Sequence, residues 1–101
     1  MIPITTVPQF LTNVVEHSKK AAVAVLFTSP TCEPCKTLKP KIEAVGRKVF
    51  VVDAADSRDL CVGLGVRAAP TLRIYKDGEI IFQGIGDKPE VLDAIVEHIA
   101  V

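Results

Sequence analysis

The chain has 101 residues, about half of them hydrophobic, and its twelve basic and twelve acidic side chains give a formal net charge of zero. A chain of this length builds one sizeable core, so we expect a single domain that spans residues 1–101. A neutral chain lacks the basic excess typical of nucleic-acid-binding proteins, and we therefore expect no nucleic-acid partner.

No apolar run approaches the roughly 20 residues that a membrane-spanning helix needs, so we expect no membrane partner. The opening MIPITTVPQFL also lacks a basic stretch followed by a long apolar segment, which is the pattern of a secretory signal. These features predict a cytoplasmic protein. In that reducing compartment a close cysteine pair is more often catalytic or metal-binding than a structural staple.

The first half of the chain predicts two helices around a buried strand. Apolar residues at helical spacing predict a helix over residues 8–18. The continuous apolar run AAVAVLF, residues 21–27, predicts a central strand that is buried on both faces. A second helix carries Cys35 on its apolar stripe and ends at Gly46, and Pro40 in its interior predicts a kink.

The second half predicts a strand over residues 48–53 and a short helix over 58–64. The segment TLRIYKDGEIIF, residues 71–82, alternates apolar and polar residues around Asp-Gly, which is a strong signal for a β-hairpin. An amphipathic helix over residues 91–99 ends the pattern. With one further strand before the first helix, these elements follow the order βαβαβαββα, which predicts an α/β fold in which helices cover both faces of a mixed sheet.

The segment SPTCEPCK holds two cysteines, Cys32 and Cys35, separated by two residues. A structural zinc site needs four nitrogen or sulfur ligands, usually arranged as two close pairs. This chain has one close pair, and the remaining candidates, Cys61, His17 and His98, are scattered singly along the sequence. The spacing therefore favours redox chemistry over zinc binding, and we expect no metal site.

The position of the pair between a buried strand and a helix explains how it would react. The amino end of a helix carries partial positive charge, which stabilises a thiolate and lowers the pKa of its thiol. Cys32 lies at the tip of the predicted helix and can meet a partner, whereas Cys35 lies on the apolar stripe and should be buried. We therefore assign Cys32 as the attacking cysteine and Cys35 as the resolving cysteine.

Several features together resemble the thioredoxin family over nearly the whole chain: the strand AVLF, then CEPCK with the helix proline, then AAPT before the KDGE hairpin, and the terminal amphipathic helix. The resemblance implies a thioredoxin fold, an α/β structure with a central five-stranded mixed sheet flanked by four helices. It also implies a monomeric protein-disulfide reductase without a bound cofactor, which acts on disulfide-containing proteins through a mixed disulfide. A thioredoxin reductase would then restore the dithiol.

The resemblance implies four further site residues. Pro70 would follow a cis peptide bond, so that the backbone of Ala69 could pair with a substrate segment as a short extra strand. Thr31 stands where the family usually has tryptophan, which predicts a smaller and more polar platform for substrates. Gly84 would leave room beside the active site.

Two further positions depart from the family pattern. Leu26 replaces the buried acid that many members carry six residues before the first cysteine, which predicts slower exchange. Glu33 replaces a glycine, and with Pro34 and Lys36 it is expected to tune the redox potential. The Glu33 carboxylate should raise the pKa of the Cys32 thiol while Lys36 opposes it, and the net sign is left open.

Two alternative functions remain open from the sequence. The missing buried acid and tryptophan suit a glutaredoxin-like enzyme that glutathione recharges, and a non-catalytic thioredoxin-fold binding module is the other possibility. Cys61 lies in an apolar stretch of the predicted short helix, where we expect a small core residue rather than a regulatory thiol.

Overall fold

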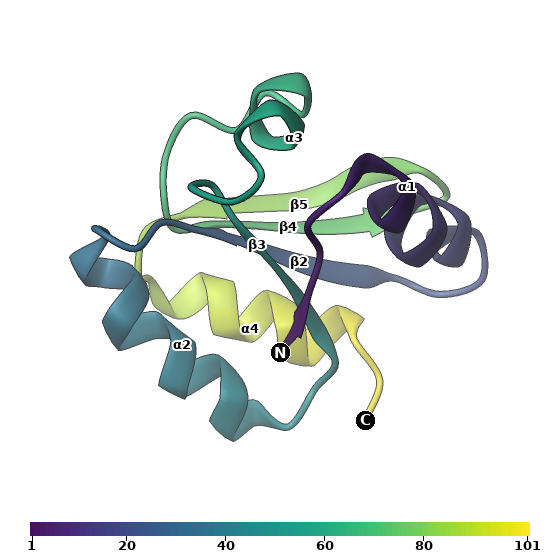
Figure 1. Cartoon of the computed structure of the whole chain (residues 1–101). Helices are drawn as coiled ribbons and strands as arrows, with labels where there is room; N and C mark the ends of the chain where they lie inside the picture. Colours follow the sequence, from purple (N-terminus) through teal and green to yellow (C-terminus); the bar gives the residue numbers. More distant parts are fainter.

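The protein folds around a five-stranded mixed sheet, and a computed structural model describes all 101 residues. The strands are β1 (Ile2–Pro3), β2 (Val23–Thr28), β3 (Val49–Asp53), β4 (Thr71–Lys76) and β5 (Glu79–Ile85). The main helices are α1 (Val7–Phe10), α2 (Glu33–Val45), α3 (Arg58–Gly63) and α4 (Pro89–His98). In Figure 1, α1 and α3 lie on one face of the sheet and α2 and α4 on the other, so the predicted fold class is confirmed.

The strand order is β1-β3-β2-β4-β5, with β2 at the centre. Strands β1, β3 and β2 run parallel, whereas β4 runs antiparallel to β2 and β5 antiparallel to β4. All six residues of β2 are buried, as the apolar run predicts. The carboxyl end of this central strand leads directly into the cysteine segment, so the most enclosed element of the sheet anchors that segment.

The core has two halves because successive residues of a strand point to opposite faces. Phe27 belongs to the half that packs under α1 and α3, together with Phe10 and Tyr75. Leu26 belongs to the half that packs under α2 and α4, together with Leu38. The two neighbouring residues of β2 therefore support different halves of the molecule.

The first helical segment matches its predicted position but not its predicted form. It comprises α1, a π-helix over Leu11–Glu16 and a turn of 3₁₀-helix over His17–Lys19. Its buried residues, Phe10, Val14 and Ser18, recur every four residues. Spacing of four is compatible with both an α-helix and the wider π-helix, in which hydrogen bonds join residues five apart, so periodicity could not separate the two.

The β4–β5 hairpin turns at Asp77 and Gly78, whose φ angles of 54° and 75° are the positive values of a type I′ turn. Ser18 holds this turn: its carbonyl accepts from the Asp77 N–H at 2.8 Å and its hydroxyl accepts from the Gly78 N–H at 2.9 Å. Strand β5 continues to Ile85, three residues beyond the predicted end, where it pairs with Thr71. The hairpin therefore extends to the level of the AAPT segment.

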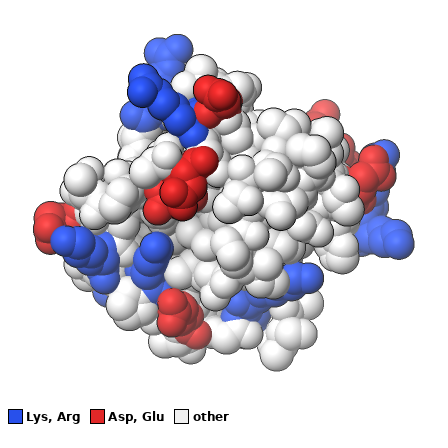
Figure 2. Space-filling model, viewed as in Figure 1, with Lys and Arg blue, Asp and Glu red and all other residues white.

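Helix α2 continues through Pro40 and ends at Gly46, whose φ of 73° is a left-handed conformation that favours glycine. On the face in Figure 2, most charged side chains lie toward the outline and one acidic side chain lies nearer the centre, whereas uncharged surface covers β1 and the segment leading into α1. None of the helices has the combination of length and hydrophobicity that crossing a membrane requires.

Candidate active site

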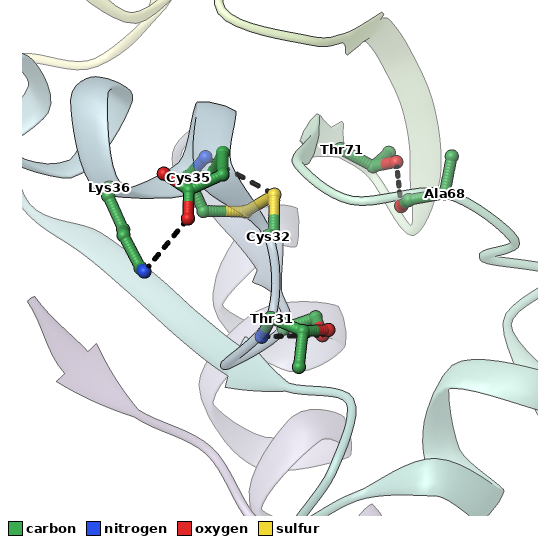
Figure 3. Close-up of a disulfide and its surroundings, with 8 residues drawn as sticks. Thr31, Cys32, Cys35, Lys36, Ala68 and Thr71 are labelled. Carbon is green, nitrogen blue, oxygen red and sulfur yellow. Dashed lines mark hydrogen bonds and ion pairs between the residues drawn. A yellow bond between two sulfur atoms is a disulfide. The ribbon is translucent and has the colours of Figure 1, made fainter.

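The cysteine pair lies where β2 gives way to α2. Cys32 is the N-cap residue of α2, with the extended backbone conformation typical of that position. Its sulfur accepts a hydrogen bond from the backbone N–H of Cys35, with an N–Sγ distance of 3.2 Å. The two cysteines form a disulfide with their Cα atoms 5.3 Å apart, and Figure 3 shows the Cys32 sulfur at the start of the helix.

The two cysteines differ in exposure in the way that the sequence predicts. Cys35 is only 2% exposed and lies on the apolar stripe of α2 with Leu38 and Ile42. Cys32 is partly exposed. An incoming group can therefore approach the Cys32 sulfur, whereas the Cys35 sulfur is shielded by the core.

The charged residues beside Cys32 pair with each other. The Lys36 ammonium lies 3.1 Å from a Glu33 carboxylate oxygen across one helical turn, a contact that is drawn in Figure 3. The two side chains are 64% and 83% exposed, so water and salt screen the pair strongly. The opposite charges of Glu33 and Lys36 largely offset each other. Pro34 fits the first turn of the helix because an N–H at this position would have no partner within the helix.

The segment before Cys32 is held by short-range hydrogen bonds. The hydroxyl groups of Ser29 and Thr31 lie 3.2 Å apart, and the Thr31 N–H donates to the Ser29 hydroxyl at 3.4 Å. Thr31 is exposed.

The AAPT segment, residues 68–71, leads into β4, and its peptide bond between Ala69 and Pro70 is cis. The Thr71 hydroxyl donates to the Ala68 carbonyl at 2.7 Å, as drawn in Figure 3, and the Gly86 N–H donates to the Pro70 carbonyl at 2.9 Å. Neither the N–H nor the C=O of Ala69 forms a hydrogen bond within the chain. The neighbouring residues are thus fixed while the polar backbone groups of Ala69 remain available.

An apolar cavity of about 310 Å³ connects this segment to the cysteine segment. Its lining comes from β2, the residue after β3, α3, residues 66–67 and both segments: Phe27, Thr28, Ser29, Ala54, Cys61, Val66, Arg67, Ala68 and Ala69. Several of these side chains are small, and their small size leaves the space open. The sequence reasoning did not find this cavity because its lining residues are far apart along the chain.

Gly84 and Gly86 have different structural roles. A Cβ atom on Gly84 would lie 3.0 Å from both the Phe82 ring and the Val91 side chain, so core packing under α4 accounts for glycine there. Gly86 has a φ of 94° and binds the Pro70 carbonyl. Of the two glycines, sequence reasoning chose Gly84, but Gly86 is the one that contacts the AAPT segment.

Leu26 is fully buried among aliphatic side chains and pairs with Leu72 and Val51 on the neighbouring strands. Cys61 is a buried free cysteine in the other half of the core, as predicted. Burial raises the pKa of the Cys61 thiol, and the Asp53 carboxylate adds to this increase, while Arg73 opposes it. No group of three or more His, Cys, Asp or Glu side chains is arranged to hold a metal ion.

Comparisons with known proteins agree with this geometry. The sequence profile of the family described as Thioredoxin matches residues 2–100. Thioredoxin Asp f 29 of Aspergillus fumigatus is 30% identical, over 96% of this chain and 94% of that protein. The crystal structure of Malassezia sympodialis thioredoxin superposes with a TM-score of 0.81 at 29% identity, covering 97% of this chain and 90% of the other. Protein disulfide-isomerase A3 of Gallus gallus is also 30% identical, but this chain spans only 22% of its length.

The chain therefore belongs to the thioredoxin family. Family, fold and the Cys32–Cys35 pair together define a thiol–disulfide oxidoreductase that acts on protein disulfides.

Replacing Gly84 by alanine should lower the free energy of unfolding by about 1–3 kcal/mol, because the new methyl group would overpack Phe82 and Val91. Denaturant unfolding measures this change. Gly63→Ala is the matched control, since that glycine has open space around its Cβ position and lies in α3, where alanine is the better helix former. Equal stability of the Gly84→Ala variant and the parent would contradict the packing role.

Cys61 should react with iodoacetamide at least about tenfold more slowly in the folded, reduced protein than in denaturant, because both burial and a raised pKa suppress its thiolate. Since the pKa is raised, the thiolate should form only at a higher pH than in the unfolded chain. Mass spectrometry of the alkylated peptides against pH measures both effects. Native-state modification at the denatured rate would show that Cys61 is accessible.

Proposed function

We propose that the protein reduces disulfides of protein substrates through a dithiol–disulfide cycle of Cys32 and Cys35. The observation that carries the proposal is the hydrogen bond from the Cys35 N–H to the Cys32 sulfur at the amino end of α2. The same donor and the partial positive charge of the helix end would stabilise the Cys32 thiolate in the reduced protein.

In the first step, the Cys32 thiolate attacks one sulfur of the substrate disulfide. A mixed disulfide forms, and the other substrate sulfur leaves as a thiolate that takes up a proton. Cys35 then attacks the Cys32 sulfur, loses its proton and releases the second substrate thiol. Two electrons pass from the dithiol to the substrate, and the Cys32–Cys35 disulfide is the product.

The proton of Cys35 has no buried acceptor at position 26. The aliphatic surroundings of Leu26 leave water or the departing substrate thiolate near Cys32 as the proton acceptor. We therefore propose that resolution of the mixed disulfide is slower than it would be with a carboxylate at this position.

Substrate docking is proposed to use Ala69 and Thr31. The free N–H and C=O of Ala69 suit an extended substrate segment that adds main-chain hydrogen bonds. The apolar cavity between the two segments would accept a side chain of that segment, while Thr31 offers a small polar contact. Glu33, Pro34 and Lys36 would tune the redox potential, and Gly84 would act indirectly by allowing Phe82 and Val91 to pack.

We propose that a thioredoxin reductase restores the dithiol and that the protein works as a cytoplasmic monomer. Glutathione is the alternative donor. Recycling of the oxidised protein by NADPH with a thioredoxin reductase, compared with recycling by glutathione at cellular concentration, separates the two donors. Faster recycling by glutathione would favour the glutaredoxin-like alternative.

The Cys35→Ser variant should accumulate a mixed disulfide with a protein substrate, because Cys32 can attack but nothing can resolve the adduct. Cys32→Ser should accumulate none and should lose turnover almost completely, by at least about a thousandfold. Intact mass under non-reducing conditions measures the adducts.

The Cys61→Ser variant is the control for these two variants: it keeps both Cys32 and Cys35, so it should resolve the mixed disulfide and accumulate no adduct. A mixed disulfide formed through Cys35 in the Cys32→Ser protein would reverse the proposed roles. Full biological effect of the Cys32→Ser/Cys35→Ser double variant would favour the binding-module alternative.

Replacing Leu26 by aspartate should raise the rate at which the mixed disulfide is resolved at neutral pH, since a buried carboxylate can accept the Cys35 proton. The same change should destabilise the fold by about 1–3 kcal/mol, because the carboxyl group would be buried among aliphatic side chains without a hydrogen-bond partner. Stopped-flow rates and denaturant unfolding are measured together. Leu26→Asn, which is polar but cannot accept a proton in this way, is the matched control. Equal rates for the asparagine and aspartate variants would contradict proton acceptance.

A further inference from the structure

A second, more polar pocket lies on the β4–β5 side of the segment that precedes the cis bond. Its volume is about 220 Å³. It is lined by Gly65, Val66, Arg67, Ala68, Thr71, Arg73, Gln83 and Ile85. No acidic residue is among them, and Val66, Arg67 and Ala68 also line the apolar cavity that reaches Ser29 of the cysteine segment. The two spaces therefore flank the same short segment.

Arg73 is 7% exposed and is held entirely by neutral groups. Its Nε donates to the side-chain oxygen of Gln83 at 2.7 Å, and its Nη1 donates to the Leu64 carbonyl at 2.7 Å and to the Tyr75 hydroxyl at 3.2 Å. The guanidinium carbon also lies 5.6 Å from the centre of the Phe27 ring. These contacts fix the guanidinium but supply no negative charge.

The remaining nitrogen of Arg73, Nη2, has no hydrogen-bond partner in the chain. Because no fully buried side-chain nitrogen or oxygen lacks a partner, Nη2 must reach solvent, and Arg73 lines the pocket. Arg67 is exposed and forms neither a hydrogen bond nor an ion pair. The pocket thus has two guanidinium groups without a counter-charge.

This arrangement suits an anion. A buried charge is costly unless it is paired, and Arg73 is charged at every physiological pH. A guanidinium also presents a planar set of donors that matches the two oxygens of a carboxylate. A negatively charged group in the pocket would meet the free donor of Arg73 and the exposed guanidinium of Arg67.

We propose that this pocket binds one carboxylate, supplied by an Asp or Glu side chain of the polypeptide that docks at Ala69. We assign the carboxylate to the docked polypeptide because Ala68, which lines the pocket, is the direct neighbour of Ala69 in the chain. The inference rests on the proposed function, since it requires a docked disulfide substrate. It makes Arg67 and Arg73 specificity-determining residues for substrates with acidic residues near their disulfide.

Disulfide peptides that carry one Glu, placed in turn at each position within four residues of the reacting cysteine, are compared with the same peptides carrying Gln. At the best position the parent protein should prefer Glu by about tenfold in kcat/KM at low salt. The preference should fall to below about twofold in Arg67→Gln and in Arg73→Met, and should shrink as salt is added. Arg58→Gln removes an exposed charge outside the pocket and should keep the preference.

Reduction of the neutral bis(2-hydroxyethyl) disulfide separates this proposal from the proposed function. Arg58→Gln should reduce it at the parent rate, whereas failure of the parent protein to reduce it would refute the oxidoreductase cycle itself. Arg67→Gln keeps the test valid if Arg73→Met folds poorly, because Arg67 makes no contact that the fold requires. If Arg73 had only a structural role, its replacement would leave the ratio of kcat/KM between the Glu and Gln peptides unchanged.

Acetate, titrated while the amide signals of residues 65–68 are followed by NMR, tests for a free carboxylate as ligand. A Glu preference that both arginine variants lose establishes the substrate carboxylate. If acetate shifts the amide signals but the peptides show no Glu preference, the substrate carboxylate is refuted as the ligand, and the pocket is a site for small free carboxylates. Equal kcat/KM for every Glu and Gln pair, with no acetate shift, would overturn the pocket as an anion site.

Discussion

The hydrogen bond between the Cys35 N–H and the Cys32 sulfur is the contact on which the chemistry of this protein depends. An N-cap normally uses an oxygen to satisfy one of the free N–H groups at a helix start, and here the sulfur of Cys32 takes that place. The bond that begins α2 is therefore also the bond that would favour negative charge on Cys32. Because β2 is buried along its whole length, the point at which the helix begins is fixed relative to the sheet.

The two faces of the sheet differ in the groups that they bury. The half of the core under α2 and α4, which contains Leu26, holds no buried charged side chain. The opposite half contains the buried guanidinium of Arg73, close to Phe27 and Tyr75. The buried charge of this chain thus lies on the opposite face of the sheet from Leu26 and α2, where it bonds the Leu64 carbonyl.

Features set by local chemistry could be predicted from the sequence. Asp77-Gly78 fixes the hairpin turn, Gly46 ends α2, and the apolar run of β2 identifies the centre of the sheet, because each depends on a few neighbouring residues. The difference in exposure between Cys32 and Cys35 also follows from their spacing on one helix.

Features set by distant contacts could not be predicted in this way. The π-helical form of residues 11–16 depends on packing, since spacing of four fits more than one helix type. Gly84 and Gly86 can be distinguished only once Phe82, Val91 and the Pro70 carbonyl are placed around them. Alternation in the hairpin marks Arg73 as a polar residue on one face of β4, but its burial depends on other parts of the chain that cover that face.

Hydrogen bonds fix residues 64–70, the segment before β4, at three points. The carbonyl groups of Leu64, Ala68 and Pro70 each accept a hydrogen bond. The donors are, in the same order, the Arg73 side chain, the Thr71 hydroxyl and the Gly86 N–H. The segment is therefore fixed on both sides of Ala69. A partner that pairs with Ala69 would meet a backbone that is already in place, and little ordering entropy would oppose its binding. The side chain that bonds the start of this segment, Arg73, also has an unpaired donor and lines the pocket. Arg73 therefore both fixes the start of this segment and, in the proposed pocket, would select an acidic partner.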